Sequence, residues 1–276
     1  MLLYMSNTIN ITEKKYKKLV IQVNLKGFVF CVLDTLSNSA LTLKTVNFSD
    51  YSTTSKIEDY FWKAFSEHPD MSLKYDEVVV IHDNNLNTFV PKALFDEQFL
   101  GSYLQYNTMV FDTDFFTFDE IPNHELNNVY VPYVNINNYL LDQFGTFNYK
   151  HSGSILLNKL FGLSKNNDEK QVFAHFASER FDLVVVQNQK LIFYNSFEYQ
   201  TSEDFIYFLL FTAEQLQLNP ENFKLQLLGD ISKESPYFDI AYKYIRNVSL
   251  LDVSELEQQN ELSTAQNLKH FILLQS

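Results

Sequence analysis

A pair of short apolar runs joined by a polar turn occurs twice in this chain, and this repetition constrains the fold more than any other feature. KLVIQVNLKGFVFCVLD, residues Lys18–Asp34, is the first example. FDLVVVQNQKLIFYNSF, residues Phe181–Phe197, is the second. Apolar runs of this length that are separated by turn residues are typical of paired β-strands. Each stretch therefore predicts a β-hairpin.

The residues after the first hairpin predict several further elements. Ala40–Phe48 alternates apolar and polar residues, as a strand does. Ser55–Phe65 has its apolar residues on one helical face, with Ser55 as the cap. Glu77–Asp83 is a continuous apolar run, which favours a strand covered on both faces. Pro91 suits the first turn of another helix.

The second half of the chain predicts the same order of elements. Gln171–Ala177 reads as a strand before the hairpin, so that three antiparallel strands come first. A helix capped by Thr201 or Ser202 follows, with acidic residues in its first turn. The remaining elements are a strand, a helix and a strand, expected at Phe223–Asp230, from Pro236 onward, and at Val248–Val253.

Between these two series lies additional material. TMVFDTDFFTF and NNVYVPYV predict strands, and NINNYLLDQFG and SGSILLNKLFG predict helices that Gly145 and Gly162 stop. The most polar connector, Leu163–Lys170, is the expected domain boundary. We therefore predict a frayed N-terminus over residues 1–16, a first lobe over 17–165 and a second lobe over 166–276.

Composition limits the classes of function. The net charge of −13 disfavours a nucleic-acid partner, and Lys14–Lys18 (KKYKK) is interpreted as a solvated leader rather than a phosphate-binding arm. The single cysteine, Cys31, excludes an internal disulfide. The densest apolar run, Phe205–Phe211, is far shorter than the ~20 residues that cross a bilayer. The default expectation is therefore a cytoplasmic protein without a membrane span.

A mixed sheet with this order of elements is the ribonuclease-H-like unit, and two such units in tandem form the actin-like ATPase architecture, of α/β class with mixed sheets. The chain resembles a bacterial family, domain of unknown function 3822, from Lys18 to about Leu274 and most sharply over Phe173–Asp230. The resemblance implies an actin-like ATPase fold, distantly similar to cytoplasmic pilus-assembly proteins. The family has no established activity, so the resemblance assigns no functional residue.

Nucleotide-binding proteins of this architecture carry a phosphate loop at the first hairpin of each half. A carboxylate at the end of the first strand holds Mg²⁺, and glycine amides approach the phosphates. In the first hairpin of this chain, Asn24 stands where the aspartate is expected. Gly27 is the one glycine of the turn, and Lys26 is the side chain that could contact a phosphate.

The other two loops are poorer in glycine. The turn of the second half, Ser178–Arg180, contains none, and Gly229 stands alone before Asp230 after a later strand. Each charge-assisted contact that is lost removes about 1.5–3 kcal/mol. The sequence therefore favours a degenerate site in which these residues only form turns and strand ends.

Other catalytic and metal constellations are weaker. A ribonuclease-H-type nuclease needs converging carboxylates, and the candidate positions do not supply three of them. These positions are Gln22, Asn24, His82, Asp83, His175 and Asp230. The acidic run Asp112, Asp114, Asp119 and Glu120 is interpreted as a solvated edge rather than a Ca²⁺ loop.

Two isolated residues receive structural interpretations. His151 is expected to cap a helix or to form a hydrogen bond in the core. Trp62 is expected in the core or at an interface.

Two hypotheses for function remain. The first is a non-catalytic interaction or scaffold protein, without cofactor or metal, whose partner is another protein or a second copy of itself. The second is an ATP-binding enzyme or switch that uses Mg²⁺ at a divergent site between the lobes. It requires one cleft to be lined by Asn24, Lys26, Gly27, Ser178, Arg180, Gly229 and Asp230.

Overall fold

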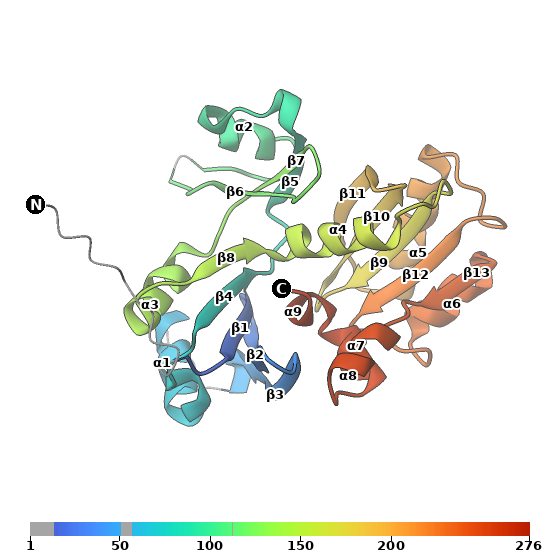
Figure 1. The fold of residues 1–276 in the computed structure, drawn as a ribbon. Helices are drawn as coiled ribbons and strands as arrows, with labels where there is room; N and C mark the ends of the chain where they lie inside the picture. The colour runs from blue at the N-terminus through green and yellow to red at the C-terminus, as the bar shows by residue number, and fades with distance from the viewer. Residues whose placement is uncertain (1–13, 51–56, 112) are drawn as a thin grey trace, which may run out of the picture.

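The computed structural model describes residues 14–50, 57–111 and 113–276, and its largest features are two five-stranded sheets with a helix between them (Figure 1). The frayed N-terminus expected before residue 14, the predicted cap Ser55 and the acidic residue Asp112 lie outside the described residues. A third, three-stranded sheet lies at the top of Figure 1.

The first large sheet has the strand order β3-β2-β1-β4-β8. Neighbours β3, β2 and β1 are antiparallel, whereas β4 and β8 run parallel to β1. The bounds are β1 Lys17–Asn24, β2 Gly27–Asp34, β3 Ser39–Asn47, β4 Glu77–His82 and β8 Asn148–His151. The hairpin predicted over Lys18–Asp34 is confirmed, and a turn at Leu25–Lys26 joins β1 to β2.

The second large sheet has the order β11-β10-β9-β12-β13, with the same sequence of antiparallel and parallel pairs. The bounds are β9 Gln171–Phe176, β10 Arg180–Gln187, β11 Lys190–Glu198, β12 Lys224–Gly229 and β13 Asn247–Leu250. The turns between β1 and β2 and between β9 and β10 occupy corresponding positions in the two sheets, and both line one hollow.

Alternate residues of the central strands enter different cores, because successive side chains of a strand point to opposite faces. On β1, Leu19 and Ile21 pack with α1 (Ile57–Glu67) and α3 (Val134–Phe144) on the outer face. Val20 points the other way, into a core that also contains Phe173 and Val184 of the second sheet. Both faces of the sheet are therefore buried.

Helices complete the layers. Helix α4 (Ser152–Leu163) lies between the two large sheets, and most of its residues are buried (Figure 1). The outer face of the second sheet is covered by α5 (Ser202–Gln215) and α6 (Pro236–Tyr244). The chain ends in α7 (Ser254–Gln259), α8 (Thr264–Lys269) and α9 (Phe271–Leu274). Helix α9, which belongs to the predicted second lobe, contacts β1 and β2 of the predicted first lobe. The division into lobes at residue 165 therefore stays a prediction.

The small sheet contains the clearest error of the sequence interpretation. Pro91 does not begin a long helix: it ends β5 (Asn87–Pro91), an edge strand, where a residue without an N–H is tolerated. Two short 3-10 turns, η4 (Lys92–Leu94) and η5 (Glu97–Phe99), then lead to α2 (Leu100–Leu104). The sheet is completed by β7 (Leu126–Tyr130) and β6 (Thr117–Glu120), in the order β5-β7-β6.

Two glycines behave differently at their helix ends. Gly145 has a φ of 76° and ends α3 as predicted. Gly162 lies inside α4, which continues to Leu163, so the prediction that it stops this helix is wrong. The amide of Ser164, the next residue, donates hydrogen bonds to the carbonyl oxygens of Leu160 and Gly162. The last turn of α4 therefore closes without a glycine in the left-handed conformation.

Candidate functional site

A hollow of about 860 Å³ lies where the β1–β2 turn meets the β9–β10 turn. Four of the seven residues predicted for a phosphate site line it: Asn24, Lys26, Ser178 and Arg180. The hollow therefore brings together four of the seven residues that the ATP-binding hypothesis requires in one cleft.

The other three predicted residues are engaged elsewhere. A Cβ at Gly27 would overlap the Val46 carbonyl oxygen of β3, and a Cβ at Gly229 would overlap the Phe176 carbonyl oxygen of β9. Gly229 also has a φ of +88°, which disfavours other residues. The Asp230 carboxylate forms an ion pair with Lys269 at 2.9 Å. The two glycines allow close strand packing, and none of the three residues lines the hollow.

The two turns contact each other directly across the hollow. The Lys26 ammonium forms an ion pair with the Glu179 carboxylate, although both side chains remain more than half exposed. Asn24 is used within its own turn, because its Oδ1 accepts a hydrogen bond from the Lys26 amide at 2.8 Å. The side chain in the expected metal-ligand position therefore stabilises the turn.

Arg180 forms a second and deeper connection. It is the first residue of β10, and its guanidinium forms an ion pair with Asp83, which directly follows β4 of the other sheet. Its Nε lies 3.5 Å from Asp182 Oδ1. The side chains of Arg180, Asp83 and Asp182 are 12%, 7% and 2% exposed. Arg180 therefore compensates two buried carboxylates at once.

Asp83 is held by donors from three elements. Besides Arg180, Gln22 Nε2 of β1 donates to Asp83 Oδ2 and Ser152 Oγ of α4 donates to Asp83 Oδ1, each at 3.1 Å. Burial alone would raise the pKa of this carboxyl, but the Arg180 charge outweighs burial and holds the pKa below its usual range. Asp83 is therefore an anion whose oxygens are already occupied.

Asp182 sits at the centre of a row across three strands. Its register partners are His175 on β9 and Ser196 on β11. Ser196 Oγ donates to Asp182 Oδ1, and His175 Nδ1 lies 3.3 Å from Asp182 Oδ2. Burial opposes the charge, but Arg180 and the hydrogen bonds hold the pKa of Asp182 well below its usual range.

The order of groups in this row differs from that of a hydrolytic triad. In a triad the histidine lies between the nucleophile and the carboxylate, so that it can remove the nucleophile's proton. Here the carboxylate of Asp182 lies between Ser196 and His175. The row is therefore suited to holding Asp182 in place rather than to activating Ser196.

Carboxylates outnumber cations around the hollow. Four acidic residues line it, against only Lys26 and Arg180 on the basic side. The acidic residues are Asp83, Glu179, Glu198 and Asp204. Within the described residues, no group of three or more His, Cys, Asp or Glu side chains is placed to hold a metal ion.

Another buried polar cluster corrects the sequence interpretation of Asp119 and confirms that of His151. Asp119 is not on a solvated edge: it accepts hydrogen bonds from the His151 amide at 2.8 Å and from Tyr130 and Ser154 side chains, and burial raises its pKa. His151 caps α4, as expected, because its Nδ1 accepts from the Gly153 amide at 3.0 Å. Trp62 is 66% exposed and does not belong to the core.

The sequence interpretation missed Asp182 and Ser196. A usable signal was present, because Asp182 is a lone charge inside the apolar run FDLVVV. A charge in a buried strand requires a partner.

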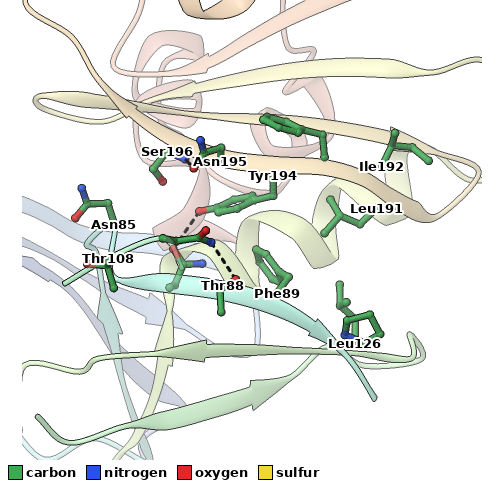
Figure 2. Close-up of a pocket in the computed structure, with 14 residues that line it drawn as sticks. Asn85, Thr88, Phe89, Thr108, Leu126, Leu191, Ile192, Tyr194, Asn195 and Ser196 are labelled. Atoms are coloured by element: carbon green, nitrogen blue, oxygen red, sulfur yellow. Dashed lines mark hydrogen bonds between the residues drawn. The ribbon is translucent and has the colours of Figure 1, made fainter. Parts of the chain in front are cut away.

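A second hollow, of about 410 Å³, lies between the edge strands β5 and β11. Figure 2 shows Phe89 of β5 and Tyr194 of β11 pointing into the gap between these strands. Their ring centroids are 4.7 Å apart, and the lining residues are all uncharged. This hollow is a seam between the small sheet and the second large sheet, with no ionic chemistry.

The model of a family described as protein of unknown function, DUF3822, matches residues 6–248. The chain belongs to the DUF3822 family. This confirms the predicted family. No curated protein matches the chain in sequence. Among the described residues of this DUF3822 protein, no helix combines the length and apolarity needed to span a bilayer.

Solved structures similar to this DUF3822 protein confirm the predicted actin-like ATPase fold. A Bacteroides thetaiotaomicron protein with this fold and unknown function has a TM-score of 0.79 and 21% identity, covering 97% of this chain and 99% of that one. The PilM–PilN type IV pilus biogenesis complex has a TM-score of 0.59 and 13% identity, covering 93% and 97%. At these identities the similarity concerns the fold alone.

Proposed function

We propose that this DUF3822 protein is a non-catalytic interaction or scaffold protein on a degenerate actin-like ATPase fold. The observation that carries the proposal is a pair of ionic contacts between the two sheets: Lys26–Glu179 joins the two hairpin turns, and Arg180–Asp83 joins the start of β10 to the end of β4. They occupy the space in which the fold would place phosphates. The protein thus uses its interlobe contacts to hold the lobes together.

Opening this contact for a nucleotide would be costly. A phosphate that recruited Arg180 would leave Asp83 as a buried carboxylate without its cation. Breaking a buried ion pair costs about 3–5 kcal/mol. The excess of carboxylates around the hollow also repels a triphosphate. Both effects favour a cleft that stays closed.

The partner in this proposal is a protein. The similar PilM–PilN structure is a complex of type IV pilus biogenesis, so the fold is compatible with a role in assembling proteins. The net charge of −13 disfavours nucleic acid. We infer a cytoplasmic bacterial protein that binds another protein or a second copy of itself. The matching strand orders of the two large sheets support an origin by internal duplication.

One observation favours an ATP-binding alternative. Asn24, Lys26, Ser178 and Arg180 surround a single hollow of about 860 Å³. In that alternative, Lys26 would leave Glu179 and contact a phosphate oxygen, and Mg²⁺ would need a carboxylate such as Asp83 to be released from Arg180.

Thermal unfolding with and without 1 mM Mg-ATP separates the two functions. A Kd of about 10 μM would give a hundredfold excess and about 2.7 kcal/mol of stabilisation, a shift of about 5 °C or more. We expect no shift beyond that of MgCl₂ at equal ionic strength. A shift that Lys26→Gln abolishes would overturn the scaffold proposal and support the ATP-binding alternative.

A further inference from the structure

Large apolar side chains are exposed around one hollow of the small subdomain, which consists of β5–β7, α2 and their connections. Phe99, Met109, Phe111 and Phe115 line this hollow of about 800 Å³, here named the apolar hollow. Their exposed fractions are 55%, 77%, 58% and 54%. Because water-exposed apolar groups are stabilised when another surface covers them, such a cluster marks a binding surface.

These side chains are not needed for the local core. Val90, Leu104 and Val129 are buried in a separate core of the small subdomain, together with partly buried neighbours that include Phe95 and Phe118. The loop that carries Phe111 has its own hydrogen bonds, since the Phe111 amide donates to Asp114 Oδ2 at 2.9 Å and the Asp114 amide donates to the Phe111 carbonyl at 3.0 Å. The exposed rings are thus presented by a formed loop.

The surroundings of the apolar hollow are acidic. The two charged residues that line it are Glu97 and Asp114. No Lys, Arg or His is among the described residues that line the hollow. A binding partner therefore meets apolar rings with two carboxylates beside them.

This combination selects among possible partners. An anionic membrane surface and a nucleic acid would be repelled by the acidic surroundings. A second copy of the chain carries the same net charge of −13 and is disfavoured for the same reason. A segment with apolar side chains on one face and Lys or Arg on the other satisfies both the rings and the carboxylates.

We propose that the apolar hollow binds a basic amphipathic segment of a partner protein. This inference rests on the proposed function as an interaction protein and assigns the surface and the chemistry of its partner. The apolar face of the segment covers Phe99, Met109, Phe111 and Phe115, and its cations lie beside Glu97 and Asp114.

A designed peptide pair tests the inference. The probe is a fluorescein-labelled 18-residue helix of Leu and Lys, and its counterpart has Glu in place of Lys. Fluorescence anisotropy at 0.15 M salt should show binding of the Leu/Lys peptide alone. Phe111→Ser and Met109→Ser should each weaken it about tenfold. Leu36→Ser is the matched control, because Leu36 is 73% exposed in a turn of the first sheet.

The inference would be overturned if the Leu/Lys peptide did not bind, or if Leu36→Ser weakened its binding as much as Phe111→Ser. It would also be overturned if the protein bound phosphatidylserine vesicles, or formed a dimer in sedimentation, and Phe111→Ser removed that binding or that dimer. Circular dichroism of each variant shows that it is folded. If the peptide test fails and Mg-ATP causes no shift in thermal unfolding, the inference about the apolar hollow is overturned but the scaffold proposal stands. A Mg-ATP shift would overturn the scaffold proposal instead.

Discussion

Arg180 is the residue on which the contact between the two large sheets depends. Its charge lies between Asp83 of the first sheet and Asp182 of the second, and all three side chains are largely withdrawn from water. Two carboxylates at this depth would repel each other and favour protonation. The guanidinium lowers the pKa of both carboxyls and itself remains charged, because the two anions outweigh its burial and raise its pKa.

Arg180→Gln should destabilise the protein by about 3–5 kcal/mol at neutral pH, because it leaves two buried carboxylates without a cation. The free energy of unfolding from guanidinium denaturation measures this loss. Lys26→Gln removes an exposed ion pair of the same cleft and should change stability little. Equal effects of the two substitutions would show that Arg180 does not carry the contact.

The start of α4 shows how an element depends on a capping residue. His151 Nδ1 accepts from the Gly153 amide, so its proton is on Nε2, which lies 3.2 Å from Asn84 Oδ1. Burial, and then the charge of Arg180, lowers the pKa of His151 to about 3. The ring is therefore neutral in the folded protein.

His151 should make stability depend on pH. Its folded pKa of about 3 is below the ordinary 6.5, so only the unfolded chain takes up this proton as pH falls below 6.5. The stability due to the neutral ring is present above pH 6.5 and is lost as pH falls toward 3. From pH 7 to 5 this loss is about 2 kcal/mol.

His151→Asn tests this dependence, because asparagine is also a good cap but does not titrate. Urea denaturation at pH 7 and pH 5 should show a smaller loss of stability in the variant than in the wild type. The same loss in both proteins would contradict the assignment.

Elements differed in how well sequence patterns predicted them. Strands β9 to β12 have longer apolar patterns and helix α5 has a clear cap, and these elements were predicted close to their observed bounds. The prediction for β13 extended three residues too far. Strands β5 and β8 were missed because each has only four or five residues and pairs with strands distant in sequence. Local periodicity is weak at that length, so tertiary pairing decides the structure.

At the scale of the whole molecule, one core joins the two sheets. It contains Val20 of β1, Phe173 of β9, residues of α4 and the last helix, α9. Lys18 Nζ donates to the Ser276 carbonyl at 3.0 Å, which ties the end of the chain to its first strand. The two lobes should therefore unfold together.

Leu273→Ala tests this cooperativity. Leu273 is fully buried in the shared core, so its truncation should cost about 2–5 kcal/mol. Calorimetry should still show one unfolding transition at a lower temperature. Leu36→Ala, at a 73% exposed position, is the control. Two separate transitions would show that the lobes fold independently.

The sequence alone determined most strands and helices of the two large sheets and the scarcity of glycine at the hairpins, because these properties depend on neighbours within a few residues. It also determined the family. Only the tertiary structure decided the chemistry of the cleft. Asp83 and Arg180 are 97 positions apart, and their contact exists because the packing of the two sheets brings the end of β4 against the start of β10. Whether a turn residue faces a ligand, a strand or an opposite charge depends on that packing.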